Sequence, residues 1–139
     1  MVRRFWHEEL GIVMRAGDRH PRNYYAWGYA RVLFRIIADE KMVGDEEKEE
    51  GEGRSGVVCG TLGRVKGWCF LHPRDISGWG FLMFLMQVVE GGGLGRGEEA
   101  RREVRRVVRE TREWVGKYQW KGESVEWFLK GVAELGIEK

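Results

Sequence analysis

The 139-residue sequence predicts an all-α protein, an α-solenoid built from about three antiparallel helical pairs. One observation behind this prediction is a repeated frame: "HPRNYYAWGY" begins at His20 and "HPRDISGWGF" begins at His72. The 2 prolines of the chain and two of its 3 histidines lie inside this frame, so the repetition is not a chance one. The other observation is the helical spacing of apolar residues after each copy. Repetition at this scale is typical of an array of similar supersecondary units.

The frame also marks where a helix starts. Asn23 and Asp75 occupy the same position in its two copies, and both residue types accept hydrogen bonds from the free amides at a helix N-terminus. Pro21 and Pro73 lie two residues earlier and end the preceding segment, because the residue before a proline avoids the helical region. One turn after each cap comes a large aromatic anchor, expected to be buried at equivalent positions in the two copies. These anchors are Trp27 and Trp79.

The spacing of apolar residues indicates six helices. They are expected over residues 5–15, 26–37, 57–70, 79–89, 98–118 and 124–135. The second of them carries two apolar lines, which predicts a helix covered on two sides. One line consists of Tyr29, Ala30, Leu33, Ile36 and Ile37, and the other of Trp27 and Phe34. The fifth carries a single apolar stripe opposite a charged face. This stripe consists of Ala100, Val104, Val107, Val108, Thr111, Trp114 and Tyr118.

A single helical-repeat domain, residues 1–139, accounts for this pattern. Its three repeats are expected at about 1–43, 56–90 and 98–136, with an acidic loop at 44–56 and a glycine-rich loop at 91–97. The segment 45–52, "DEEKEEGE", has six acids, one lysine and no apolar residue, so it is interpreted as a solvated loop.

Composition and charge exclude several classes of function. The net charge of +2 is too small to indicate a nucleic-acid partner. Six arginines lie between residues 101 and 112, but five glutamates lie between residues 98 and 113 and are interleaved with them, so a solvated helix face is expected there and no nucleic-acid site. The most apolar stretch is eleven residues long, too short for a membrane span. Since the N-terminal sequence has no apolar signal core, a cytoplasmic protein is expected, with reduced thiols at Cys59 and Cys69 favoured over a disulfide.

The segment "PRNYYAW", residues 21–27, closely resembles the repeat of the protein prenyltransferase α subunits, whose pattern is Pro-x-Asn-Tyr-x-x-Trp at the head of the second helix of each pair. The segment "PRDISGW", residues 73–79, is similar, and "GESVEWFLKG", residues 122–131, is a weaker third copy. The sequences of the first two copies most resemble those of the divergent α-subunit-repeat-containing proteins. In the third copy, Glu126 stands at the expected tryptophan position and Trp127 follows it. The family's usual arginine three residues after the tryptophan is replaced by Ala30 in the first copy.

This resemblance implies a subunit of a two-chain enzyme. In the family, the α subunit is a crescent of helical pairs around a β subunit, which holds the catalytic zinc and most of the isoprenoid pocket. A farnesyl or geranylgeranyl group then passes from its diphosphate to a C-terminal cysteine of a target protein. No cofactor is therefore expected in this chain, since its two cysteines and three histidines lack ligand spacing. The expected partners are a β-type subunit, with the prenyl diphosphate and the target protein at the shared site.

The resemblance also assigns roles to residues of the frame. The basic residue immediately before the motif Asn, here Arg22, and the motif tyrosine, Tyr24, would stabilise the charge of the departing diphosphate. The alternatives are a surface arginine at position 22 and a core tyrosine at position 24. Substrate-binding roles are expected for His20, Asn23 and Arg74. Packing and capping are expected of Pro21, Trp27, Pro73, Asp75, Trp79 and Trp127. The alternative function is a non-catalytic helical-repeat scaffold for protein–protein contacts.

Overall fold

The computed structural model describes residues 2–38, 53–91 and 98–137, and these parts of the chain are helical, with no strand. The helices are α1 (Val2–Arg19), α2 (Tyr24–Ile37), α4 (Gly53–Leu71), α5 (Ile76–Glu90), α6 (Glu98–Tyr118) and α7 (Glu123–Leu135). This architecture confirms the predicted all-α class. None of the helices described here is both long enough and apolar enough to cross a membrane.

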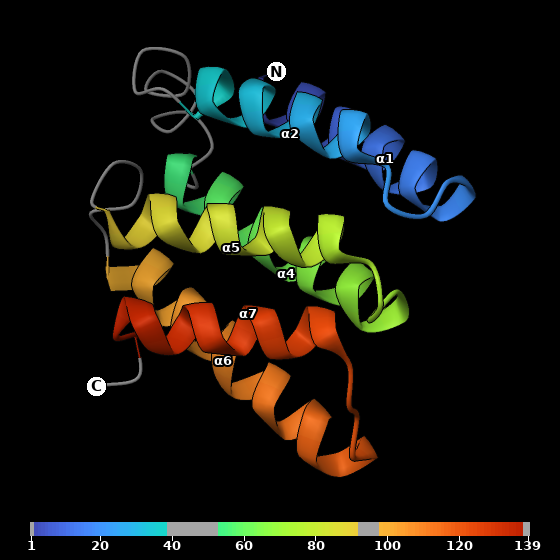
Figure 1. Cartoon of the computed structure of the whole chain (residues 1–139). Helices are drawn as coiled ribbons and strands as arrows, with labels where there is room; N and C mark the ends of the chain where they lie inside the picture. The colour runs from blue at the N-terminus through green and yellow to red at the C-terminus, as the bar shows by residue number, and fades with distance from the viewer. Residues whose placement is uncertain (1, 39–52, 92–97, 138–139) are drawn as a thin grey trace.

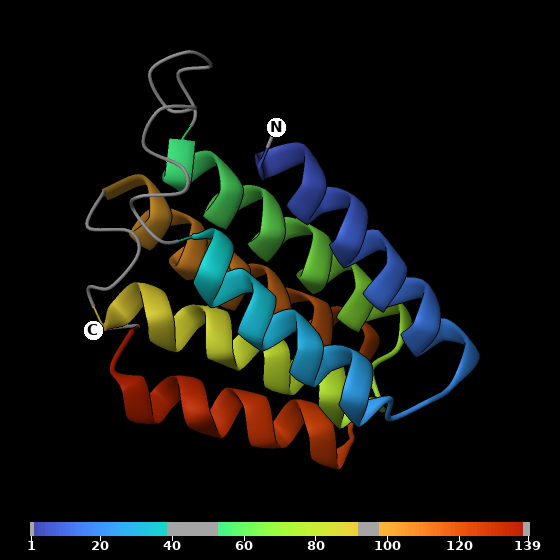
Figure 2. The same ribbon diagram turned by 90° about the horizontal axis from the view of Figure 1, so that it is seen from above.

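The helices form three successive pairs stacked in chain order, α1 with α2, α4 with α5, and then α6 with α7 (Figure 1). Seen from above, the first helices of the pairs form one layer and the second helices form another (Figure 2). Contacts run between repeats as well as within them, with α6 on α4, α7 on α5 and α5 on α2. Helices α6 and α7 make little direct contact, because they diverge toward the turn that joins them (Figure 1). The turns that join the two helices of each pair all lie on one side of the stack (Figure 1).

The frames begin helices as the sequence predicted. The Asn23 side chain accepts a hydrogen bond from the Ala26 amide, and the Asp75 side chain accepts one from the Ser77 amide. In the third repeat the N-cap is Gly122, which has no side chain to make such a bond. The frame therefore loses its cap where the resemblance to the family repeat is weakest.

Large aromatic residues join the repeats. Trp27 and Trp79 are buried, as predicted, and each stacks against the second helix of the following repeat. The ring centroids of Trp27 and Phe81 are 5.3 Å apart, and those of Trp79 and Phe128 are 4.9 Å apart. Because each of these residues buries a large apolar area, the two tilted aromatic pairs help to hold neighbouring repeats together.

The predicted burial was wrong for one side of α2 and for the end of α6. Trp27, Ala30, Phe34 and Ile37 are buried, but Tyr29 and Ile36 are exposed, because within the described residues α2 has a neighbouring repeat on one side only. In α6 the stripe is buried from Ala100 to Thr111, and Trp114 is half-buried. Tyr118, at its end, is exposed, because there α6 diverges from the rest of the stack.

Some element boundaries also differ from the prediction. Helix α1 extends to Val2–Arg19 beyond the expected 5–15. Helix α4 begins at Gly53, within the range expected to be a loop, so the expected loop 44–56 was too long at that end. The acidic segment 45–52 lies outside the described residues, as does most of the expected loop 91–97.

Both cysteines are free thiols, as favoured from the sequence. Burial raises the pKa of Cys59 to about 11, with further contributions from Glu99 and Glu103. Burial, together with the nearby Asp75 carboxylate, also raises the pKa of Cys69 well above its usual value.

Candidate functional site

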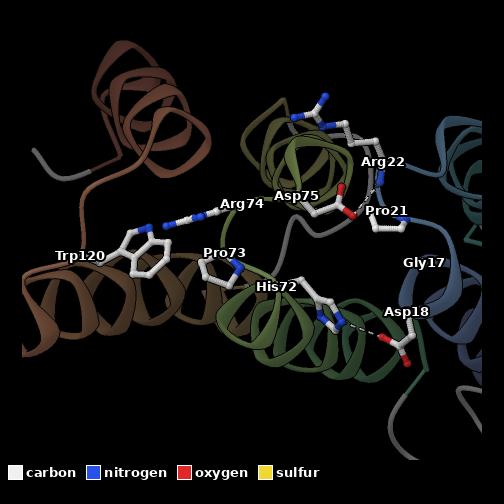
Figure 3. A pocket seen from close by; sticks show the side chains of 9 residues that line it. All are labelled: Gly17, Asp18, Pro21, Arg22, His72, Pro73, Arg74, Asp75 and Trp120. Atoms are coloured by element: carbon white, nitrogen blue, oxygen red, sulfur yellow. Dashed lines mark hydrogen bonds and ion pairs between the residues drawn. The ribbon is translucent and has the colours of Figure 1, made fainter.

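A pocket of about 380 Å³ lies on the side of the stack where the turns of the three repeats meet (Figure 3). All three repeats contribute to it. Its lining consists of Gly17 and Asp18 at the end of α1, Pro21 and Arg22 of the first frame, His72, Pro73, Arg74 and Asp75 of the second frame, and Trp120 before α7. The repeated frame therefore brings two of its copies to one cavity.

Asp75 joins the two frames. One of its carboxylate oxygens accepts from the Ser77 amide at 2.9 Å and caps α5, while the other accepts from the Arg22 amide at 3.0 Å. Arg22 has a φ of 59°, a left-handed conformation that is uncommon for a residue with a side chain. Only 7% of Asp75 is exposed, so the carboxylate side of this part-buried bond is shielded from water. Asp75 thus holds the turn that carries Arg22 against the start of α5.

His72 and Asp18 form a second link across the pocket. The Asp18 carboxylate accepts a hydrogen bond from the Trp68 indole at 2.9 Å and lies 2.8 Å from Nε2 of His72. The other ring nitrogen of His72, Nδ1, lies 2.9 Å from the Trp68 carbonyl oxygen, to which it donates. The His72 ring also stacks on the Trp68 indole, with centroids 3.9 Å apart. These contacts fix the orientation of His72 in the pocket wall.

Arg74 and Trp120 form the opposite wall. The Arg74 guanidinium lies 5.5 Å from the centroid of the Trp120 ring, and the Arg74 carbonyl oxygen accepts from the Ser124 hydroxyl at 3.2 Å. The buried indole nitrogen of Trp120 has no hydrogen-bond partner within the described structure. Arg74 is therefore held by stacking, with its charged group still available to a ligand.

The charges of the pocket favour an anionic ligand. Both carboxylates, Asp18 and Asp75, already accept hydrogen bonds from protein groups. Among the described residues, neither Arg22 nor Arg74 forms an ion pair. Guanidinium groups bind phosphate and carboxylate oxygens bidentately, so Arg74 in the pocket wall has the chemistry to bind an oxyanion, while the Arg22 guanidinium lies over the start of α5 (Figure 3). No cluster of ligands suited to a metal ion is found in the part of the chain described here.

The remaining predicted site residues lie outside the pocket lining. His20 is exposed at the end of α1, and Tyr24 is 76% exposed, so the alternative of a core tyrosine is wrong. Tyr24 stacks edge-on against Tyr25 and does not line the pocket. Asn23 uses both ends of its amide within the protein, accepting from Ala26 and donating to the Ala16 carbonyl at 3.4 Å. The Arg22 side chain extends over the start of α5, away from His72 (Figure 3).

The residues predicted to pack and cap take different positions. Pro21 lines the pocket, and the Pro73 carbonyl accepts from the Trp79 indole at 2.9 Å. Trp127 is 48% exposed, so it does not take the place of a buried frame tryptophan. In the third repeat Phe128 provides the contact to the preceding repeat.

Four residues of the pocket lining were missed by the sequence reasoning, namely Gly17, Asp18, His72 and Trp120. His72 opens the second frame as His20 opens the first, so a signal for it was present. Gly17, Asp18 and Trp120 lie outside both frames, and nothing in their spacing indicated the site. They reach the pocket only because the ends of the three pairs stack.

Comparison with known proteins identifies one repeat. Residues 6–37 match the family model of the protein prenyltransferase alpha subunit repeat. No curated protein and no solved structure gives a significant match to the chain. The matched segment starts at the buried Trp6 and ends with α2, so it covers most of the first helical pair and the whole first frame. Most of the first helical pair therefore matches the protein prenyltransferase alpha subunit repeat.

Proposed function

We propose that the chain is an α-subunit-like component of a protein prenyltransferase that acts with a β-type subunit. The observation that carries this proposal is the alpha subunit repeat over residues 6–37. The pocket supports it, because Arg22 of this repeat and Arg74 of the second frame lie beside one cavity. On this proposal, the zinc and the isoprenoid pocket are supplied by the partner.

The reaction proposed is the transfer of a farnesyl or geranylgeranyl group to a C-terminal cysteine of a target protein. The target cysteine, deprotonated to the thiolate, attacks the first carbon of the prenyl diphosphate, a carbon–sulfur bond forms, and the carbon–oxygen bond breaks. The diphosphate leaves with the electron pair, so negative charge grows on its oxygens in the transition state. Arg22 and Arg74 would stabilise that charge, and the Asp75 bond to the Arg22 amide would keep the first turn in place for it.

The alternative function is a non-catalytic scaffold for protein–protein contacts. It is favoured by the structural use of the frames, because the Asn23 and Asp75 side chains are both engaged in caps and inter-repeat bonds. The third frame also lacks the cap and the tryptophan, with Gly122 and Glu126 in their places.

Reconstitution tests the two functions against each other. The full chain would be combined with a β-type subunit from the same host, and transfer of a labelled prenyl group to a cysteine-ended peptide would be measured. We expect the chain alone to be inactive. In the complex, Arg22→Ala should lower the transfer rate about 100-fold, the usual effect of removing one such electrostatic contact.

Arg109→Ala is the matched control, because Arg109 lies on α6 and pairs with Glu113 at the surface. It should leave both assembly and rate unchanged. If the Arg22→Ala and Arg74→Ala complexes both assemble and turn over at the wild-type rate, the catalytic role is wrong and the scaffold takes its place.

A further inference from the structure

The first helical pair exposes an apolar surface, named here the N-terminal end face. It consists of Phe5 and Ile12 on α1 and of Tyr25, Tyr29, Val32 and Ile36 on α2. On α2 these residues are spaced by four, three and four positions, so they form one continuous stripe. The exposed fractions of Tyr29, Val32 and Ile36 are 47%, 62% and 54%. A contiguous apolar stripe of this kind marks an interaction surface.

The two interfaces inside the stack show what such a stripe contacts. Counted from the N-cap of each second helix, the sixth residue stacks on the tryptophan of the preceding repeat. Phe81 does so on Trp27, and Phe128 does so on Trp79. The ninth residue after the cap of α5, Phe84, packs edge-on against Phe34 of α2 in the preceding repeat, with centroids 6.2 Å apart.

The same positions of the first repeat belong to the N-terminal end face. Tyr29 is the sixth residue after the Asn23 cap and Val32 is the ninth. They correspond to Phe81 and Phe84 but have no preceding repeat to contact within the described structure.

The first helices of the first two repeats, α1 and α4, also have matching residues at equivalent positions. In α4 the Thr61 hydroxyl accepts a hydrogen bond from the Trp6 indole of the preceding repeat at 2.8 Å. Glu9 stands 52 positions before Thr61, and its carboxylate is an acceptor at the edge of the end face, where it binds the Tyr29 hydroxyl at 2.5 Å. Apolar residues and an acceptor therefore recur in the arrangement that receives a repeat elsewhere in this chain.

The described residues at the opposite end of the stack, on α6 and α7, do not form the matching surface. The fourth residue after the cap is Trp27 in α2 and Trp79 in α5, but it is the exposed Glu126 in α7. The exposed residues of α6 are charged, apart from Gly116 and Tyr118. A polar outer face of this kind ends a solenoid. A second copy of the chain therefore cannot offer its C-terminal end to the N-terminal end face of the first.

We propose that the N-terminal end face binds a helical pair of the same repeat class, presented by a partner protein. The second helix of that pair carries a large aromatic residue four positions after its N-cap. This residue stacks on Tyr29, as Trp27 does on Phe81, and the next turns of the same helix cover Val32 and Ile36. The face is distinct from the pocket of the proposed function, which lies at the turn end of the pairs.

The test joins a suitable pair to the full chain, so that the pair is held at a high effective concentration. A second copy of residues 1–52 is fused ahead of residue 1, because this segment supplies Trp27 and Phe34 in the required positions. We expect the added pair to fold on the chain in a single cooperative unfolding transition. The added helical signal and a rise in the melting temperature of about 5 °C or more should both be seen by circular dichroism.

Two matched controls show whether the gain comes from this face. Trp27→Glu in the added copy alone imitates Glu126 of the third repeat and should abolish the gain. Val32→Glu in the receiving copy should do the same, and its own effect on the unfused chain is measured in parallel. An unchanged melting temperature in the fusion, or an equal gain in either control, would overturn the proposal.

Sedimentation velocity on the unfused chain tests whether a second copy of the chain covers the N-terminal end face. A monomer across the micromolar range supports a partner of a different sequence. A dimer that Val32→Glu dissociates would mean that a second copy covers the face, and the proposal would be wrong.

Discussion

Trp68 lies between two glycines, and this arrangement gives a sharp test of the packing between repeats. A Cβ added at Gly78 of α5 would lie 2.5 Å and 2.8 Å from two carbons of the Trp68 ring. A Cβ at Gly17 of α1 would lie 2.8 Å from another carbon of the same ring. Real Cβ atoms do not approach a neighbour so closely, so Gly78→Ala requires the indole to move.

The indole has little freedom to move. Its nitrogen donates to Asp18 and to the Met14 carbonyl, and one of its faces is stacked on His72. The Trp27 ring meets it edge-on with centroids 5.1 Å apart. Overpacking of such a site costs about 1–3 kcal/mol of unfolding free energy. A helical Gly→Ala change gains about 1 kcal/mol from helix propensity, so the net effect is read against a control that has this gain alone.

Gly63→Ala is that control, because a Cβ at Gly63 of α4 meets no atom within 4 Å. We expect Gly63→Ala to be more stable than the wild type by about 0.4–1 kcal/mol. Gly78→Ala should be less stable than Gly63→Ala by about 1–3 kcal/mol, measured by urea unfolding at 25 °C. In a Trp68→Leu background the difference should shrink toward zero. Equal stability of the two alanine variants in the wild-type background would refute the argument.

Three further predictions follow from single contacts. The pKa of His7 is lowered by burial and by Arg64 and Arg3, so the unfolded state takes up the proton first as the pH falls. Stability should therefore be complete above about pH 6.5 and decrease below it, and His7→Gln should flatten that part of the profile of melting temperature against pH. Since burial raises the pKa of both thiols, Cys59 and Cys69 should react with a disulfide reagent at pH 8 far more slowly than in urea. Asp75→Asn turns an amide donor toward the Arg22 or Ser77 N–H and should cost about 1–3 kcal/mol in chemical unfolding, whereas an unchanged midpoint would contradict the role of Asp75 as a double acceptor.

The sequence predicted what depends on local chemistry. Two helix starts, their caps and the burial of Trp27 and Trp79 follow from residue type and spacing, and all are confirmed. The burial of the two sides of α2 was not predictable in this way, because an end repeat and an inner repeat have the same periodicity. The pocket was only half predictable. Arg22 and Arg74 lie in the frames, but Asp18 and Trp120 reach them through stacking between repeats, which no local pattern encodes.

The difference between the two frames at the cap position is explained by what each cap faces. Asn23 lies beside the Ala16 carbonyl at the end of α1, so it needs a donor as well as the acceptor that caps α2. An amide side chain supplies both. Asp75 instead faces the Arg22 amide of the preceding frame and the Ser77 amide of its own helix, so it needs two acceptors, which a carboxylate supplies. The cap residue therefore differs between the two copies because its hydrogen-bond partners differ. Asn23 bonds only within its own helical pair, whereas Asp75 also bonds to the repeat before it.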